Sequence, residues 1–405
     1  MAVKEGHMDA AFLTLTPAQR RRSLTAVILH MLGIGLTMGV TIPLTALVLE
    51  RWGTDTWLIG VVAGMPAAAI LLFMPFFPRV IARLGTLPSM YWGCALGIVA
   101  ILLHPLFPSV GAWALLRFLI GAGMALPWLV GETWINAVAL EASRGRVIAI
   151  YGAALFAGFA VGPLLLEGVG VEGWPPFVLA AGSVAVAVVP LLLARRLAPP
   201  MPAKPVLRLR EVVWAAPTVA MAALVAGTLE NAYYALLPLY ALRNALSQAL
   251  SLHLLTVLLV GGIALQFPIG WLADRGDRHL TLGALGVLSG LGALLLPLTL
   301  GNDLLLGILV FVLGGAVLAF YTVGLALLGQ RFRAADLAVA NATFIMLYES
   351  GSFLGPGIAG GAMDLWEPNG LIGAVTVISL LFAALAFSRA GERAPQRLPP
   401  TRAGP

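Results

Sequence analysis

The second half of this chain repeats the first at an offset of 193 residues, and the repeating units are apolar segments long enough to cross a lipid bilayer. The two best-matched segments each contain two glycines and a proline: Gly158, Gly162 and Pro163 in the first, and Gly351, Gly355 and Pro356 in the second. Glycines on such faces let helices approach closely, so we expect both sets to be helix-packing surfaces. The repeat predicts two copies of one helical unit joined in the middle.

The composition requires lipid as the solvent for most of the surface. Hydrophobic residues make up 60% of the chain and charged residues only 10%, whereas a typical soluble domain has about 25% charged residues. Apolar stretches of the length that crosses a bilayer lie at residues 23–48, 57–81, 87–107, 110–138, 146–168, 174–194, 212–240, 250–273, 280–299, 304–329, 337–362 and 370–388. We therefore expect an all-α membrane protein with twelve transmembrane helices in two pseudo-symmetric six-helix bundles.

The basic residues gather on one side of these segments. With twelve spans both termini lie on the same side, and the tails and loops of that side hold all of the 24 Lys and Arg residues except three. The exceptions are Arg51 and Arg243, in loops of the opposite side, and Arg117, within a span. By the positive-inside rule we expect both termini to be cytoplasmic. The net charge of +6 then reflects topology and gives little support to nucleic-acid binding.

The loops define the expected domains. We expect a cytoplasmic tail at residues 1–22, an N-terminal bundle at 23–194, a Pro- and Arg-rich linker at 195–211, a C-terminal bundle at 212–388 and a second cytoplasmic tail at 389–405. The single cysteine, Cys94, lies within a span and has no partner, so no disulfide is expected. The first 20 residues lack an apolar core, and we do not expect a cleavable signal peptide there.

Three motifs carry a resemblance to a known family. GWLADRGDR, at residues 270–278, resembles the loop signature of the major facilitator superfamily. RFLIGAGMA, which begins at Arg117, and the pattern that ends at Pro163 resemble that superfamily's fourth and fifth spans. The blocks RFLIGAGMALPWLVGETWIN and QFPIGWLADR look like the YcaD-type branch of uncharacterised bacterial transporters. The resemblance implies two six-helix bundles around a central cavity, although the first loop departs from the pattern at Pro78 and Ala82.

The loop after the eighth span holds Asp274, Arg275 and Arg278. The positive-inside rule does not explain an aspartate such as Asp274 on the side where Lys and Arg gather. A carboxylate there can cap a neighbouring helix or pair with an arginine across the bundle interface. We expect these residues to take part in gating. A solvated loop that follows the charge rule is the alternative, chiefly for Arg278.

Four ionisable residues of fixed charge remain within spans: Arg117, Glu132, Glu230 and Glu349. Each costs about 2.5–3.5 kcal/mol at the centre of a helix if it is unpaired, so each needs a physical reason. Arg117 keeps its charge in all conditions and can therefore anchor a substrate carboxylate or balance a glutamate. A structural ion pair is the equal alternative for Arg117.

Glu132 lies about 22 Å further along the same helix than Arg117. That depth suits a structural or gating contact with Arg83, Arg144 or Arg146 better than a substrate site.

Glu230 lies about 24 Å along the seventh span, in the region where carriers of this kind hold substrates. Asn231, Tyr233 and Tyr234 follow it and offer hydrogen-bonding groups and aromatic faces. A carboxyl group in an apolar cavity can load and release a proton in the physiological pH range. We expect Glu230 to couple proton movement to substrate binding, with a structural hydrogen-bonding role as the alternative.

Glu349 lies near the centre of the eleventh span, directly after Tyr348. We expect Glu349 to be a second proton-coupling residue and both residues to contact substrate. The alternative is a neutral glutamate that bonds to a neighbouring helix. Because Glu230 and Glu349 belong to the same bundle, they can share one proton or one cationic ligand.

The expected function is secondary active transport of a small organic solute by alternating access. The chain has no phosphate-binding P-loop, no HExxH motif and no nucleophile elbow, so we expect no enzyme, no cofactor and no metal. Proton-coupled efflux by antiport is favoured, because the resemblance implies an antiporter-like fifth span. Proton symport or facilitated uptake has the same fold, and a lipid-moving or sensing protein is the alternative from another class. The expected partners are the solute, protons and membrane lipid, for a monomer in the bacterial inner membrane.

Overall fold

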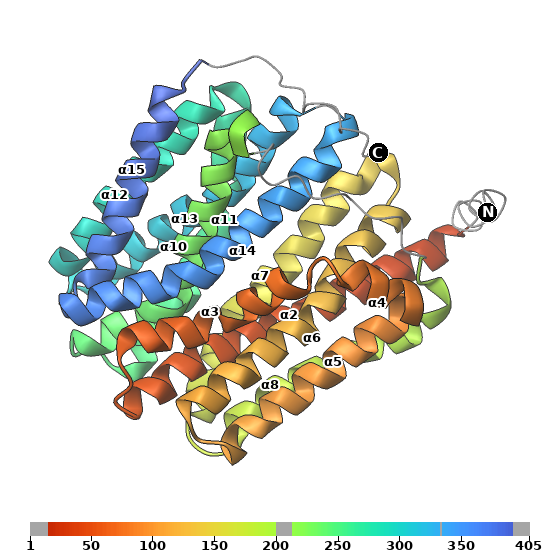
Figure 1. Ribbon diagram of the computed structural model, residues 1–405, viewed down its shortest axis with the longest axis horizontal. Helices are drawn as coiled ribbons and strands as arrows, with labels where there is room; N and C mark the ends of the chain where they lie inside the picture. The colour runs from red at the N-terminus through yellow and green to blue at the C-terminus, as the bar shows by residue number, and fades with distance from the viewer. Residues whose placement is uncertain (1–14, 200–212, 333, 392–405) are drawn as a thin grey trace, which may run out of the picture. The chain divides into compact units, whose positions relative to one another are not determined.

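The computed structural model describes residues 15–199, 213–332 and 334–391, and all regular structure within them is helical (Figure 1). Most of the predicted linker and of both predicted tails lies outside the described residues. Twelve helices are long: α2 (Pro17–Arg51), α3 (Thr56–Phe73), α5 (Thr86–Leu103), α6 (Val110–Val138), α7 (Arg144–Val169), α8 (Pro175–Leu193), α10 (Pro217–Arg243), α11 (Gln248–Arg275), α12 (Arg278–Thr299), α13 (Asp303–Arg331), α14 (Ala334–Leu365) and α15 (Gly370–Ser388). The short ones are α4 (Phe77–Leu84), η1 (His104–Leu106), η2 (Glu141–Ser143) and η3 (Arg195–Leu197).

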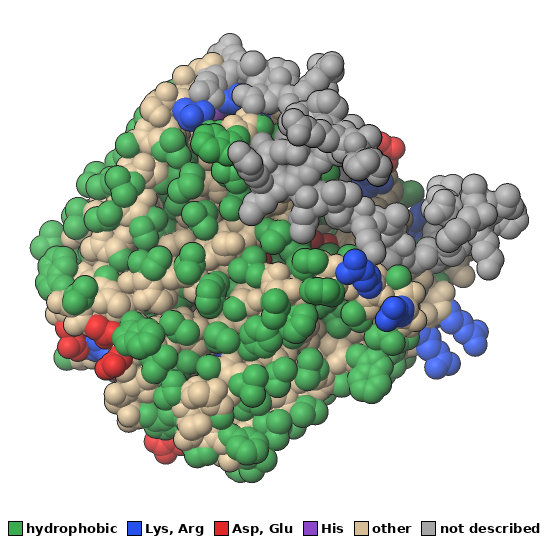
Figure 2. All heavy atoms as spheres, in the orientation of Figure 1, with side chains coloured by type: hydrophobic (Ala, Val, Ile, Leu, Met, Phe, Trp, Pro, Cys, Tyr) green, Lys and Arg blue, Asp and Glu red, His purple; other side chains and the backbone are tan. Residues whose placement is uncertain are grey.

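Eleven of the twelve long helices in the described part are long and apolar enough to cross a membrane. The twelfth, α14, has 32 residues and covers the predicted eleventh span. The chain is therefore a multi-pass membrane protein, and the predicted all-α fold of twelve transmembrane helices is confirmed. Hydrophobic side chains are spread widely over the face shown in Figure 2, and few charged side chains interrupt them, as expected for a surface that lipid solvates.

The second span is the one whose predicted boundary differs most from the structure. We expected it at residues 57–81, but α3 ends at Phe73 and the chain restarts as the short helix α4. Pro75 and Pro78 explain the break, because neither has a backbone N–H and each disfavours a helical residue before it. Gly85, with a φ of 90°, then ends α4 and leads into α5.

Several helices begin at a residue whose side chain binds the first free backbone N–H groups. The hydroxyl of Ser109 accepts from Ala112 at the start of α6, and that of Ser247 accepts from Leu250 at the start of α11. Such caps satisfy donors that have no partner within the helix. They place the α6 and α11 starts within two residues of the predicted positions.

The chain forms two compact units. The first contains residues 1–48 and 72–204, and the second contains residues 49–71 and 205–405. The second unit thus holds the predicted C-terminal bundle together with the end of α2 and most of α3. The predicted bundle boundaries at 23–194 and 212–388 stay a prediction.

In each unit a glycine-rich helix packs closely against another long helix. In the first unit, a Cβ atom at Gly158 of α7 would meet the backbone of Leu32 in α2. In the second unit, a Cβ atom at Gly351 of α14 would meet the backbone of Leu224 in α10. Gly158 and Gly351 are related by the 193-residue shift, so the repeat in the sequence is a repeat of helix contacts.

Candidate functional site

The carboxyl group of Glu230, on α10, is buried within the second unit. Its side chain is 2% exposed. One oxygen, Oε2, accepts hydrogen bonds from the hydroxyl of Tyr348 on α14, at 2.9 Å, and from that of Tyr234, at 3.3 Å. The other oxygen, Oε1, is buried and has no hydrogen-bond partner among the described residues. One side of the carboxyl group is therefore held by the protein, and the other can bind a proton or a donor from a ligand.

Aromatic and amide side chains hold Tyr348 and α14 in place. The ring of Tyr321, on α13, packs edge-on against Tyr348 with 5.1 Å between ring centroids. On the neighbouring turn, the amide of Asn231 donates to the Ser352 hydroxyl at 2.9 Å, and that hydroxyl donates to the Tyr348 carbonyl at 3.0 Å. These contacts link α10, α13 and α14 around Glu230. The Tyr321 ring contacts the Tyr348 ring, and the Asn231–Ser352 pair holds the backbone of α14 at Tyr348.

The close approach of α10 and α14 depends on glycines. A Cβ atom at Gly227 of α10 would meet the Tyr348 carbonyl, and one at Gly355 of α14 would lie 2.6 Å from the Cα atom of Thr228. Backbone atoms cannot rotate away from a clash as side chains can. The two helices therefore reach this distance only with glycine at these positions. The same approach brings the Tyr348 hydroxyl within reach of Glu230.

The structure places the other predicted residues of this site nearby on the same two helices. Glu349 is 6% exposed and follows Tyr348 on α14. Tyr233 is fully buried, and its hydroxyl has no hydrogen-bond partner among the described residues. The second unit thus carries two buried carboxyl groups and four tyrosines within α10 and α14. In the described part of the chain, no group of three or more His, Cys, Asp or Glu side chains could hold a metal ion.

Arg117 belongs to the first unit, on α6. It is 3% exposed, and a terminal nitrogen donates to the Thr41 hydroxyl of α2 at 3.3 Å. Its Nε atom is buried without a hydrogen-bond partner in the described residues. The described contacts of Arg117 are thus with a neutral hydroxyl, so the guanidinium keeps donors for a further acceptor.

Glu132, also on α6, makes a different contact from the expected one. Its Oε1 atom accepts a hydrogen bond of 2.8 Å from the indole of Trp128, one turn earlier. Among the described residues, Glu132 forms no ion pair with Arg83, Arg144 or Arg146, and the three arginines are exposed. The gating role of Glu132, Arg83 and Arg146 stays a prediction.

The loop between α11 and α12 is tied to α13. Arg278 donates to Asp274 Oδ1 and to the Ala326 carbonyl of α13, both at 2.8 Å. The guanidinium of Arg275 lies 3.7 Å above the ring of Trp271. Asp274, at the end of α11, therefore pairs with the first residue of α12 within the second unit, and its predicted role in gating stays a prediction.

A further cluster of charges, which the sequence analysis missed, lies at the opposite ends of the helices of the second unit. Arg243, at the end of α10, donates to both carboxylate oxygens of Glu50, at the end of α2, at 2.8 Å each. Its Nη1 atom lies 3.5 Å from Glu367 Oε1, just after α14. Next to this pair, Arg51 donates to the side-chain carbonyl of Gln248 at 2.8 Å. Arg51 and Arg243 are the two loop arginines that break the positive-inside pattern, which was the signal in the sequence.

Asp364 extends this cluster to α3. Its two carboxylate oxygens accept from the backbone N–H groups of Thr56 and Trp57, at 2.9 and 2.8 Å. The last turn of α14 thus caps the first turn of α3, where a negative charge is favourable. Further along α3, Cβ atoms at Gly60 and Gly64 would meet the carbonyls of Pro356 and Phe353. We call the contacts of Glu50, Arg51, Asp364 and Glu367 with α3, α10 and α11 the end cluster.

Comparison with known proteins shows which family and which proteins this chain resembles. The profile described as "Major Facilitator Superfamily" matches residues 23–252 and 219–405. An uncharacterised MFS-type transporter of Enterobacter sp. (strain 638) is 26% identical over 92% of this chain and 97% of its own. The uncharacterised MFS-type transporter YcaD of Salmonella enteritidis PT4 is 26% identical, with the same coverage of both chains. YfkF of Bacillus subtilis (strain 168), a third uncharacterised MFS-type transporter, is 26% identical over 88% of this chain and 92% of its own.

Two solved structures share the fold. A bacterial homologue of the human lysosomal transporter Spinster, in an inward-facing and occupied conformation, superposes with a TM-score of 0.74 at 15% identity, over 92% of this chain and 98% of that one. The nucleoside transporter NupG superposes with a TM-score of 0.66 at 14% identity, over 91% and 96% of the two chains.

Proposed function

The chain belongs to the Major Facilitator Superfamily and is a secondary transporter, and from that premise we propose that it exports a small organic solute in exchange for protons. We further propose that it does so in the bacterial inner membrane, with both termini in the cytoplasm. The buried carboxyl group of Glu230, held on one oxygen and without a described partner on the other, carries this proposal.

Competition at Glu230 links the proton to the solute. A proton on Oε1 makes the carboxyl group neutral, and a solute that donates a hydrogen bond or carries positive charge needs the same oxygen. If the two ligands exclude each other, each lowers the apparent affinity for the other by the same factor. Glu349, one residue beyond Tyr348, is the second carboxyl group that we assign to this site.

The end cluster gives the proposed cycle a gate. Alternating access requires that one end of the transport pathway opens while the other closes. We assign Glu50, Arg243 and Asp364 to the contacts that hold the end of α2 and the start of α3 against α10 and α14. Their release would remove the polar contacts that hold the end of α2 and the first turn of α3 to α10 and α14.

The test begins with ligand discovery. Purified protein is screened by thermal shift against metabolites, antibiotics and lipophilic cations at pH 6 and pH 8, because a ligand that binds only the folded state raises the melting temperature. The best ligand is then followed in proteoliposomes with the pH gradient in either direction. Antiport predicts accumulation on the acidic side, and Glu230→Gln abolishes it while the protein still folds.

Three outcomes would contradict the proposal. Accumulation of the solute on the alkaline side would indicate symport. Solute flux that does not depend on the pH gradient would indicate facilitated diffusion. Unchanged proton-linked flux in both Glu230→Gln and Glu349→Gln would remove the carboxyl groups from the mechanism.

A further inference from the structure

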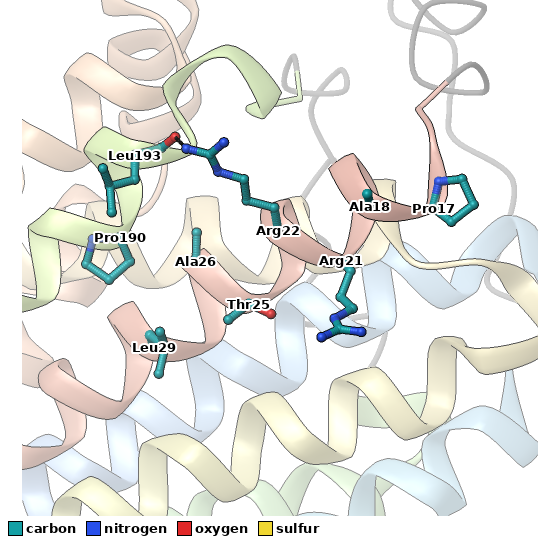
Figure 3. Close-up of a pocket in the computed structure, with 9 residues that line it drawn as sticks. All are labelled: Pro17, Ala18, Arg21, Arg22, Thr25, Ala26, Leu29, Pro190 and Leu193. Atoms are coloured by element: carbon teal, nitrogen blue, oxygen red, sulfur yellow. Dashed lines mark hydrogen bonds between the residues drawn. The ribbon is translucent and has the colours of Figure 1, made fainter.

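An open groove of about 650 Å³ lies in the first unit, between the start of α2 and the end of α8 (Figure 3). Figure 3 shows Arg21 and Arg22 on the first turns of α2, and Pro190 and Leu193 on the facing end of α8. The groove is lined by Pro17, Ala18, Arg21, Arg22, Thr25, Ala26, Leu29, Pro190 and Leu193. It lies at the end of the helices where the basic residues gather.

The polar and apolar parts of the groove are separated along α2. Arg22 and Leu29 are two turns apart, which is about 10 Å along the helix. The apolar part is accessible from outside the protein, because Leu29 is 45% exposed and Leu193 is 64% exposed. Val186 and Val189 continue this exposed apolar surface along α8, at 70% and 48%. Arg21 and Arg22 thus lie nearer the end of α2 than the apolar walls, so a bilayer crossed by these helices would meet the charges at its boundary and the apolar walls at acyl-chain depth.

The groove carries positive charge without acidic neighbours in its lining. Arg22 donates one hydrogen bond of 2.8 Å to the Leu193 carbonyl, which holds its guanidinium at the rim and leaves its other donors available. Arg21 is exposed and forms no ion pair within the part of the chain that the structure describes. Neighbouring guanidinium groups are well suited to bind a phosphate group through several N–H donors.

We propose that this groove binds an anionic phospholipid. Its phosphate contacts Arg21 and Arg22, and one acyl chain lies against Leu29, Pro190 and Leu193. A membrane lipid fits both parts of the groove, whereas a soluble phosphate would use only the rim. The site is separate from Glu230 and does not depend on the transport direction.

Binding is measured on the full-length protein in detergent, by native mass spectrometry during titration with dioleoylphosphatidylglycerol. Arg21→Gln together with Arg22→Gln is expected to raise the dissociation constant of the tightest lipid at least tenfold. The control is Arg79→Gln with Arg144→Gln, which removes two exposed basic residues outside the groove and should change that constant less than twofold. Leu29→Trp fills the apolar part without changing charge and should weaken binding about as much as the arginine pair, whereas Val186→Trp, outside the lining, should not.

Zwitterionic dioleoylphosphatidylcholine and inorganic phosphate complete the experiment. The proposal expects phosphatidylcholine to bind at least tenfold more weakly and millimolar phosphate not to displace the lipid. Equal losses in the groove and control arginine pairs would overturn the proposal, because binding would then follow net charge alone. Displacement by phosphate together with unchanged binding in Leu29→Trp would also overturn it, in favour of a soluble anion. Melting temperatures in lipid-free detergent verify that each variant is folded.

Discussion

Arg243 binds both carboxylate oxygens of Glu50, and the two residues occupy equivalent positions of the two sequence repeats. The shift of 193 residues that relates Pro163 to Pro356 also relates Glu50 to Arg243. One duplicated position thus carries opposite charges in the two copies, and the two charges meet. The pair is partly buried, with side chains 16% and 23% exposed.

Removal of either charge of this pair should destabilise the end cluster. We expect Glu50→Gln and Arg243→Gln each to lower the melting temperature, and the double variant to lose less than the sum, with a coupling on the order of 1 kcal/mol. The exchanged pair, Glu50→Arg with Arg243→Glu, should recover part of the loss. Additive single effects would contradict a direct interaction.

The cap that Asp364 provides is expected to protect the first turn of α3. Asp364→Ala leaves the N–H groups of Thr56 and Trp57 without their acceptor and should cost about 1 kcal/mol. Hydrogen–deuterium exchange at these amides should become faster, while exchange in α6 stays unchanged. The matched control is Asp303→Ala, at the exposed start of α13. Equal protection of Thr56 and Trp57 in the Asp364 variant and the wild type would show that the cap has no role.

The hydroxyl of Tyr348 should matter for transport more than the hydroxyl of a buried tyrosine that does not contact Glu230. Tyr348→Phe removes the shorter hydrogen bond to Glu230, and loss of a bond to a charged acceptor corresponds to about a tenfold fall in proton-linked flux. Tyr240→Phe is the control, because the buried Tyr240 hydroxyl has no hydrogen-bond partner among the described residues. A similar decrease in both variants would point to packing as the cause.

Docking of residue 391 should depend on pH. Asp277 Oδ2 accepts from the Gly391 N–H at 2.6 Å, and Oδ1 accepts from the His279 N–H at 2.7 Å. Burial raises the pKa of Asp277, but these hydrogen bonds outweigh it, so the pKa lies below the ordinary value of 3.8. A lowered carboxyl pKa means that the stabilisation is complete above pH about 4 and is lost as pH falls through the lowered pKa.

Limited proteolysis after residue 388, measured between pH 7 and pH 3, checks this dependence. Cleavage should rise only at the acidic end of the range, and Asp277→Asn should raise cleavage at pH 7. Equal cleavage rates of the Asp277→Asn variant and the wild type at pH 7 would contradict the docking contact.

Gly351 should tolerate no side chain. In Gly351→Ala the new methyl group would meet the Leu224 carbonyl of α10, and overpacking against backbone costs about 1–3 kcal/mol. Gly329→Ala on α13 is the control, because a Cβ atom there meets no atom within 4 Å and alanine favours the helix by about 1 kcal/mol. The melting temperature should fall in the first variant and rise or stay constant in the second.

The number of helices was predictable from sequence because hydropathy and charge asymmetry report directly on a membrane. The end of α3 differed from the predicted end at residue 81 because the sequence remains apolar through Pro75 and Pro78. Hydropathy does not change there, but the two prolines interrupt the helix. Buried Glu230 and partly buried Tyr348 were each identified as candidates, since a polar group within a membrane span is costly unless it has a structural or functional role. Their hydrogen bond was not predictable, because it depends on how far α10 and α14 slide along each other.

The opposite charges of Glu50 and Arg243 also restrict how such a chain can be assembled. Two copies of the first repeat arranged in the same way would bring one carboxylate against another, and two copies of the second would oppose two guanidinium groups. Like charges at contact distance repel, so this position disfavours an assembly of two identical halves. At this position each repeat therefore finds an opposite charge only in the other repeat, and not in a duplicate of itself.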